Sequence, residues 1–406
     1  MAVDPFFGLE PVMISPSLSI SPQAVAAPAS GIAAVMKHGF GRSDIIPLWV
    51  GEGDLPTPAV ICRAAATALE RGETFYMPQP GIPELRRALA QYHDRVYGGL
   101  FGKQFETDRF FVTGSGMQAI QLAVRLVAGV GEEILVPTPA WPNFSAAVGV
   151  AGAHVREVAM RFDPAGWILD LALLEASISS QTRAIFLNSP SNPTGWTADP
   201  LLLQAILDLS RKHGLWIIAD EAYGRFTYSD ALAAPSLHSL ITLEDRVLFV
   251  NTFSKNWAMT GWRIGWIEAP VAAGPAIENL IQYSTSGVAV FMQRAACTAL
   301  NDGEAFLATQ MDRCRRGLES ISSILATSSR VHFAPAGAFY LFFGIDGIAD
   351  STAFAGRLLQ KTGVGLAPGR AFGMAGEGYF RLCFARETKE LTAAAERLLK
   401  FLDHDA

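Results

Sequence analysis

Leu215-Trp216-Ile217-Ile218-Ala219 is an unbroken apolar run, and Asp220-Glu221 follow it directly. Short apolar runs bounded by turn signals are typical of strands that are buried on both faces of a parallel sheet. Four more such runs are predicted to be strands, at 109–113, 133–136, 183–188 and 247–251. Helical patterns cover 116–128 and 201–212. Strands that alternate with helices predict an α/β layered fold.

The 406 residues are too many for one ordinary core and favour two domains. The pattern changes in the last third, where 331–344 and 379–384 predict strands of an antiparallel or mixed sheet and 387–402 a closing helix. We therefore predict an N-terminal arm with part of a small domain at 1–59, a large domain at 60–285, and the remainder of the small α+β domain at 286–406. Residues 1–45 are rich in Pro, Ser and Ala and carry little pattern.

The composition argues against several kinds of partner. There are 32 basic and 38 acidic residues without a basic run, so no nucleic-acid partner is expected. No run reaches the roughly 20 apolar residues that span a bilayer, and the N-terminus lacks a signal-peptide pattern, so a soluble protein is expected. The four cysteines lie far apart without a CxxC pair, which fits a reducing, cytoplasmic compartment. The histidines show no metal-binding spacing, so no metal site is expected.

Several polar segments follow the predicted strands. Small residues at 113–116 precede a helix and would let backbone N–H groups approach a phosphate, although for this turn alone a plain strand-to-helix connection is favoured. Asp220 is either a helix N-cap or a buried carboxylate that faces a cation. Lys255 follows a buried strand, where burial would lower its pKa and make it a nucleophile. Arg263, among apolar neighbours, is either a phosphate clamp or part of a salt bridge.

In this order, these segments resemble the class I/II aminotransferases, which have fold type I of the pyridoxal-phosphate-dependent enzymes. The matching stretches are Ser-Pro-Ser-Asn-Pro-Thr-Gly at 189–195, Ala-Asp-Glu-Ala-Tyr at 219–223, Ser-Lys at 254–255 through Arg-Ile-Gly at 263–265, and Arg-Leu-Cys-Phe-Ala at 381–385. The resemblance runs from about residue 47 to the end. It implies a large domain with a mostly parallel, seven-stranded sheet flanked by helices, and a homodimer with active sites at the interface.

The resemblance also implies a role for each residue. Lys255 would bind the cofactor as a Schiff base and shuttle the substrate proton, Asp220 would pair with the pyridine nitrogen, and Tyr223 would donate to the phenolate oxygen. The other implied cofactor contacts are Asn192 at the same oxygen, Trp141 on the ring face, Ser115, Gly116, Met117, Thr252 and Arg263 at the phosphate, and Tyr76 reaching over from a partner subunit. Arg381 would hold the substrate α-carboxylate, with Gly51 and Asn192 beside it.

The expected function is therefore ping-pong transfer of the amino group of an L-amino acid to a 2-oxo acid through pyridoxamine phosphate. A pyridoxal-phosphate lyase of the C–S lyase kind is the alternative, because one scaffold can host several outcomes. A regulator that senses an effector is disfavoured, since no basic helical pattern precedes the first motif. Residues 283–293 contain no arginine, so an aromatic or other neutral substrate is at least as plausible as aspartate. Arg370 is hypothesised to line the entrance and favour acidic substrates.

Overall fold

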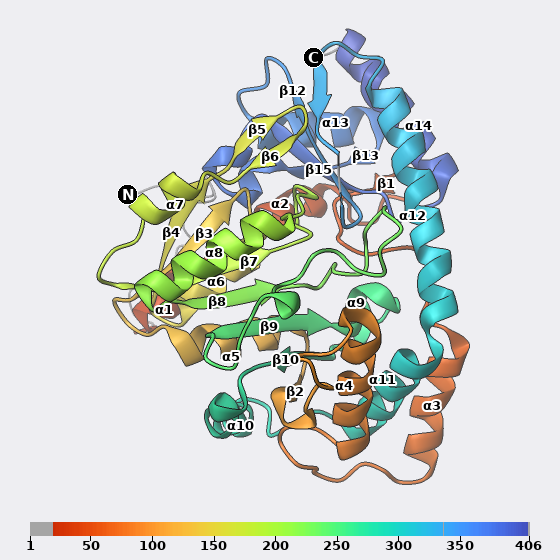
Figure 1. Cartoon of the computed structure of the whole chain (residues 1–406). Helices are drawn as coiled ribbons and strands as arrows, with labels where there is room; N and C mark the ends of the chain where they lie inside the picture. The colour runs from red at the N-terminus through yellow and green to blue at the C-terminus, as the bar shows by residue number, and fades with distance from the viewer. Residues whose placement is uncertain (1–18, 336, 405–406) are drawn as a thin grey trace.

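A seven-stranded sheet forms the centre of the computed structural model, which describes residues 19–335 and 337–404. Its strand order is β2-β10-β9-β8-β7-β3-β4 (Figure 1). The bounds are β2 Phe110–Thr113, β3 Glu133–Thr138, β4 His154–Ala159, β7 Thr182–Asn188, β8 Trp216–Asp220, β9 Val247–Thr252 and β10 Gly265–Glu268. Only β10 runs antiparallel to its neighbours within this sheet. The predicted α/β fold with a mostly parallel sheet is confirmed.

Both faces of the central strands are buried, which explains why the strands read as apolar runs. On β8, Ile217 and Ala219 pack into one hydrophobic core and Ile218 packs into the other. This alternation follows from the strand period of two residues. It continues at the end of β8, so that Asp220 and Glu221 point to opposite sides of the sheet.

Helices cover each face of the sheet. The helices α5 (Gly116–Val127), α6 (Pro142–Val150) and α10 (Gly274–Gln282) pack on the side of Ile218, and α4 (Pro83–Tyr97), α7 (Leu171–Ala176) and α8 (Pro200–His213) contribute to the other core. The limits of α8 follow from its sequence. Asp199 accepts a hydrogen bond from the N–H of Leu202 at the N-terminus, and Gly214 ends the helix in the left-handed conformation.

A second, four-stranded sheet lies in the last third of the chain, with the order β11-β12-β15-β14. The bounds there are β11 Val331–Phe333, β12 Tyr340–Ile345, β14 Ala367–Pro368, β15 Tyr379–Cys383, α13 Ser351–Thr362 and α14 Thr388–His404. The long helix α12 (Glu304–Leu325) runs along one side of the molecule and leads from the part around α3 (Ala59–Glu70) and α11 (Val290–Asp302) to this sheet (Figure 1). The segment β1 (Ile46–Pro47) pairs with β13 (Val364–Gly365). The domain limits near 59 and 285 stay a prediction.

Several short elements were not anticipated. They are α1 (Pro22–Val25), α2 (Gly31–Met36), the hairpin of β5 (Arg161–Asp163) and β6 (Gly166–Ile168), α9 (Phe253–Asn256), and the 3₁₀ turns η2 (Thr107–Arg109), η3 (Leu237–Ser239) and η4 (Thr260–Trp262). Across the described ranges, 19–335 and 337–404, no helix is both long and apolar enough to cross a bilayer. The expectation about a signal peptide rests on the first 18 residues, which lie outside those ranges.

Candidate active site

A cavity of about 420 Å³ lies at the carboxyl ends of β7, β8 and β9. Ligands of open α/β sheets bind at this edge. Of the residues that the sequence nominated, those that line the cavity are Gly51, Gly116, Met117, Trp141, Asn192, Asp220, Tyr223, Thr252, Lys255, Arg263 and Arg381. They come from segments up to 330 residues apart in the chain (51 to 381). The cavity therefore brings together most of the predicted site.

An acid and a base with displaced pKa values face this cavity. Asp220 is 5% exposed, and burial raises the pKa of its carboxyl group to about 6, although the N–H of Ala222 and the charge of Lys255 act against the rise. Burial also lowers the pKa of Lys255 to about 8. The ammonium group of Lys255 donates to the carbonyl oxygen of Gly51 at 2.6 Å. Both side chains can therefore change protonation near neutral pH, as proton-transfer groups must.

The raised pKa of Asp220 predicts a stability effect in the ligand-free protein. The folded state favours the neutral acid, so this contribution is complete below about pH 4 and is lost as the pH rises through about 6. Above that pH, the buried carboxylate costs on the order of 3 kcal/mol. Asp220→Asn keeps the acceptor for the N–H of Ala222. We expect urea unfolding to show the variant stabilised by about this amount at pH 8 and little changed at pH 4. An equal difference at both pH values would contradict the prediction.

Arg381 is a buried cation that lines the cavity. It lies on β15, is 2% exposed, and donates to Oδ1 of Asn192 at 2.8 Å and to the carbonyl oxygen of Trp49. Within the described residues, its Nε has no hydrogen-bond partner and no carboxylate forms an ion pair with it. A buried charge without a counter-ion is costly, so an anionic ligand would stabilise it.

Asn192 and Tyr223 are held in fixed orientations. Because a guanidinium only donates, the amide oxygen of Asn192 faces Arg381, and its NH₂ group is left to donate elsewhere. The hydroxyl of Tyr223 lies 2.7 Å from that of Tyr340, so one of the two donates to the other. A Cβ atom at Gly51 would overlap the hydroxyl of Tyr340, which explains the glycine at this position. The aromatic and amide groups therefore converge on one side of Lys255.

The N-terminus of α5 forms a cradle for an anion. Ser115 caps the helix with its Oγ and has φ +112°, a conformation that non-glycine residues rarely adopt. A Cβ atom at Gly265 would lie 2.8 Å from the backbone nitrogen of Gly116. Only glycine therefore fits where strand β10 passes the N-terminus of α5. Arg263 also lines the cavity with a left-handed backbone, φ +53°. Free N–H groups at a helix N-terminus beside an arginine suit a phosphate.

Three sequence hypotheses are not met in this chain by itself. Ser115 caps α5 and is not among the described residues that line the cavity, so its contact with the phosphate stays a prediction. Tyr76 is 91% exposed and is not among the described residues that line the cavity, so its contact from a partner subunit stays a prediction. Arg370 does not line the cavity as described either. Its charge acts on Glu157, where burial raises the pKa and Arg370 opposes the rise. The expectation that Arg370 lines the entrance is therefore wrong.

Other residues that line the cavity were not predicted from the sequence. Among them are Ser30, Ile32, Ala33 and Met36 of the N-terminal segment, Trp49, Asn143, Asn188 and Tyr340. Asn188 ties the ends of two strands together, because its amide donates to the carbonyl oxygen of Asp220 at 3.0 Å and its Oδ1 accepts from the N–H of Asn192 at 2.7 Å. Its place at the end of an apolar run, like that of Asp220, was the available signal. The residues of α2 carried none, since they are ordinary apolar residues.

Known proteins resemble this chain over nearly its full length. A family model described as aminotransferase class I and II matches residues 43–398. The aspartate aminotransferase of Pyrococcus horikoshii is 32% identical over 92% of this chain and 95% of its own length. Aromatic-amino-acid aminotransferase 2 of Thermococcus litoralis is 33% identical over 89% of this chain and 92% of its own length.

A solved structure agrees with these sequences. The crystal structure of the aspartate aminotransferase from Rhizobium meliloti has a TM-score of 0.87 and 29% identity, and the match covers 95% of this chain and 98% of that one. The relatives favour amino-group transfer over the lyase alternative. With a family match across most of its length, the chain belongs to the class I and II aminotransferases.

Proposed function

We propose that this aminotransferase uses pyridoxal phosphate, bound covalently by Lys255, to move the amino group of an L-amino acid with a neutral side chain to a 2-oxo acid. One observation carries the proposal. The charged residues that line the cavity are Asp220, Lys255, Arg263 and Arg381, and each matches one charged or reactive group of this cofactor and an α-amino acid.

The donor set fits pyridoxal phosphate. The anion cradle at the start of α5, with Arg263 and Thr252, would hold the phosphate. Trp141 lines the cavity and offers an aromatic face for the pyridine ring. Asp220, at the end of β8, would pair with the ring nitrogen, and the amide NH₂ of Asn192 and the hydroxyl of Tyr223 would donate to the ring oxygen.

When bound, the cofactor would act as an electron sink for charge that develops on the substrate Cα atom. Asp220 would keep the ring nitrogen protonated. A unit charge pair at about 4 Å with an effective dielectric of about 20 is worth roughly 4 kcal/mol, or about 3 pK units. Lys255, whose pKa burial lowers to about 8, would remove the proton from Cα and return it to the cofactor carbon. Arg381, which lines the cavity, would hold the α-carboxylate.

The kind of substrate side chain is inferred from the lining residues that have no role toward the cofactor or the α-carboxylate. Once the four charged residues take these roles, none of the charged residues in the described lining remains for a second carboxylate. Ile32, Ala33 and Met36 of α2 add apolar surface to the same cavity. The stretch 283–293 contains no arginine, so a second copy of the chain would not supply one from there either. A neutral, apolar or aromatic side chain fits this lining best.

Leucine and aspartate, which are close in shape and differ in charge, test this specificity. With the same 2-oxo acid as acceptor, we expect kcat/KM for leucine to exceed that for aspartate by about tenfold or more, because a carboxylate left without a partner loses on the order of 1–3 kcal/mol. Phenylalanine should behave like leucine. A preference for aspartate would overturn the neutral substrate and leave the transfer chemistry intact.

A homodimer is the proposed assembly. Phe75 and Tyr76 are largely exposed, as is Tyr283, and exposed aromatic groups of this kind mark interaction surfaces. Tyr76 would then reach the phosphate in the site of the other copy. The cysteines Cys62, Cys297, Cys314 and Cys383 are free thiols, which supports a reducing, cytoplasmic location.

A further inference from the structure

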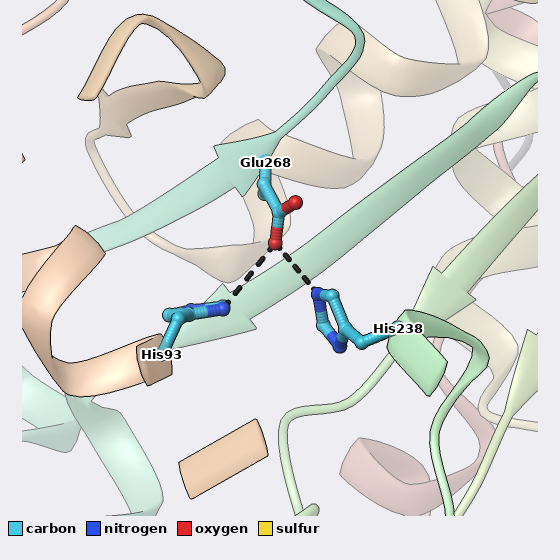
Figure 2. A group of neighbouring side chains, drawn as sticks. All are labelled: His93, His238 and Glu268. Carbon is cyan, nitrogen blue, oxygen red and sulfur yellow. Dashed lines mark hydrogen bonds and ion pairs between the residues drawn. The ribbon is translucent and has the colours of Figure 1, made fainter. Parts of the chain in front are cut away.

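A buried polar network lies behind the sheet, on the side opposite the cavity. Its centre is His93 on α4, His238 on η3 and Glu268 on β10 (Figure 2). Oε2 of Glu268 lies 2.7 Å from Nε2 of His238 and 3.3 Å from Nδ1 of His93. Arg109 donates to the other oxygen of Glu268 at 2.9 Å. All four side chains are buried, so the network must satisfy its own charges.

Protons rather than a metal ion account for this geometry. Trp266 donates to Nε2 of His93 at 3.2 Å, so the ring proton of neutral His93 is on Nδ1 and faces Glu268. Burial lowers the pKa of His93, which keeps the ring neutral. The contact of 2.7 Å between His238 and Glu268 is a hydrogen-bond distance. Arg109 already neutralises the one carboxylate of the trio, which would disfavour a divalent cation.

Ser236 connects His238 to Glu221. Nε2 of His238 faces Glu268, and its Nδ1 lies 2.7 Å from Oγ of Ser236. The same Oγ atom lies 2.6 Å from Oε1 of Glu221. A continuous chain of hydrogen bonds therefore runs from Glu268 through His238 and Ser236 to Glu221.

The pKa values of the two carboxyl groups are displaced in opposite directions. Burial raises the pKa of Glu221, against the charge of His238 and the hydrogen bonds from Ser236 and Tyr97. Burial acts on Glu268 in the same direction, but His238 and His93 outweigh it and hold its pKa well below the usual range. The ring of His238 also stacks on Phe249 with centroids 3.8 Å apart, which fixes its plane. The titratable and charged groups around His238 are His93 and Tyr97 of α4, Arg109 of η2, Glu221 after β8 and Glu268 of β10.

The network ends at the residue next to Asp220. Glu221 accepts from Ser236 and from the hydroxyl of Tyr97, at 3.0 Å, on the side of the sheet away from the cavity. Its carbonyl oxygen accepts from the N–H of Gly224 and closes the turn that carries Tyr223. We propose that Ser236 and His238 position the segment from Asp220 to Tyr223 by anchoring the side chain of Glu221. Loss of this anchor would let the turn rotate and misalign Asp220. The inference rests on the proposed role of Asp220 toward the cofactor.

Ser236→Ala tests the anchor in the full-length protein loaded with pyridoxal phosphate. The variant removes the link between His238 and Glu221 and leaves every charge in place. We expect the dissociation constant of the cofactor to rise about tenfold. A misaligned Asp220 would leave the ring nitrogen less protonated. The nitrogen of Lys255 attached to the cofactor would then hold its proton to a higher pH, and the pH midpoint of the bound cofactor's absorbance change should rise by about one unit.

Ser177→Ala is the matched control. Ser177 is also a buried serine, 9% exposed against 8% for Ser236. Its hydroxyl donates to the carbonyl oxygen of Leu173, and neither residue is among those described as lining the cavity. We expect neither the cofactor affinity nor the pH midpoint to change in this variant. If folded Ser236→Ala matched the wild type in both readouts, the positioning role would be overturned. A wild-type protein that failed to bind the cofactor would instead overturn the proposed function, and this inference with it.

Discussion

Replacing Lys255 by alanine is expected to lower kcat by about 10⁴-fold, because the cavity loses both a nucleophile and a base. In the wild type, the ammonium group donates to the carbonyl oxygen of Gly51, and burial brings its pKa to about 8. The side chain can therefore give up its proton near neutral pH, where an exposed lysine stays charged. Steady-state kinetics at saturating cofactor measure the loss. A variant that kept a tenth of the wild-type kcat would contradict the assignment.

Borohydride reduction followed by mass spectrometry separates covalent attachment from binding. The peptide that contains Lys255 should carry the cofactor mass in the wild type and not in Lys255→Ala. The variant should still bind the cofactor without a covalent bond, because Asp220 and Arg263 remain. Lys212→Ala is the control, since Lys212 lies at the surface beside Glu175. Its kinetics and its modified peptide should match the wild type.

Replacing Arg381 by alanine is expected to lower kcat/KM about a hundredfold for every amino acid tested. Truncation of one partner of a buried, hydrogen-bonded charge pair costs roughly 2–5 kcal/mol. The reason is specific to the α-carboxylate, so a primary amine that lacks this group should lose little activity. Arg381→Lys should recover only part of the loss, because an ammonium group cannot reproduce the planar contacts to Asn192 and to the backbone of Trp49.

Arg370→Ala is the matched control for Arg381. Arg370 belongs to the same part of the chain and acts on Glu157 rather than lining the cavity. We expect the folded variant to keep both its kcat/KM and its ratio of acidic to neutral substrates. An amine substrate that lost as much activity as leucine in Arg381→Ala would show that Arg381 supports the fold of the site instead of the carboxylate.

The sequence carried enough information for the inner strands β7, β8 and β9 because these strands are buried on both faces. The runs that became β7, β8 and β9 differ from the structure by at most one residue at either end. The strand β10 was not predicted. It is four residues long and ends in Glu268, which reads as a solvent-exposed charge. Its burial depends on Arg109 and His238, which are distant in sequence, so no local pattern could reveal it.

In the candidate site too, some residues could be predicted from local sequence and others could not. Asp220 and Lys255 follow apolar runs directly, and this position alone marked them as buried polar groups. The apolar residues Ile32 and Met36 lie in a segment without periodicity, and they reach the cavity only through tertiary packing. The network around His238 joins residues from α4, η2, η3, β10 and the turn after β8, and their spacing in the chain follows no motif. Side chains that act through long-range contacts thus escape a reading of the sequence.

A single-turnover experiment tests the central claim most directly. The purified protein with bound pyridoxal phosphate is mixed with leucine in the absence of any 2-oxo acid, and the cofactor's absorbance and the products are followed. The account predicts one equivalent of the 2-oxo acid per site, conversion of the cofactor to pyridoxamine phosphate, and recovery on addition of a 2-oxo acid. Continued release of ammonia without any change of the cofactor would contradict it.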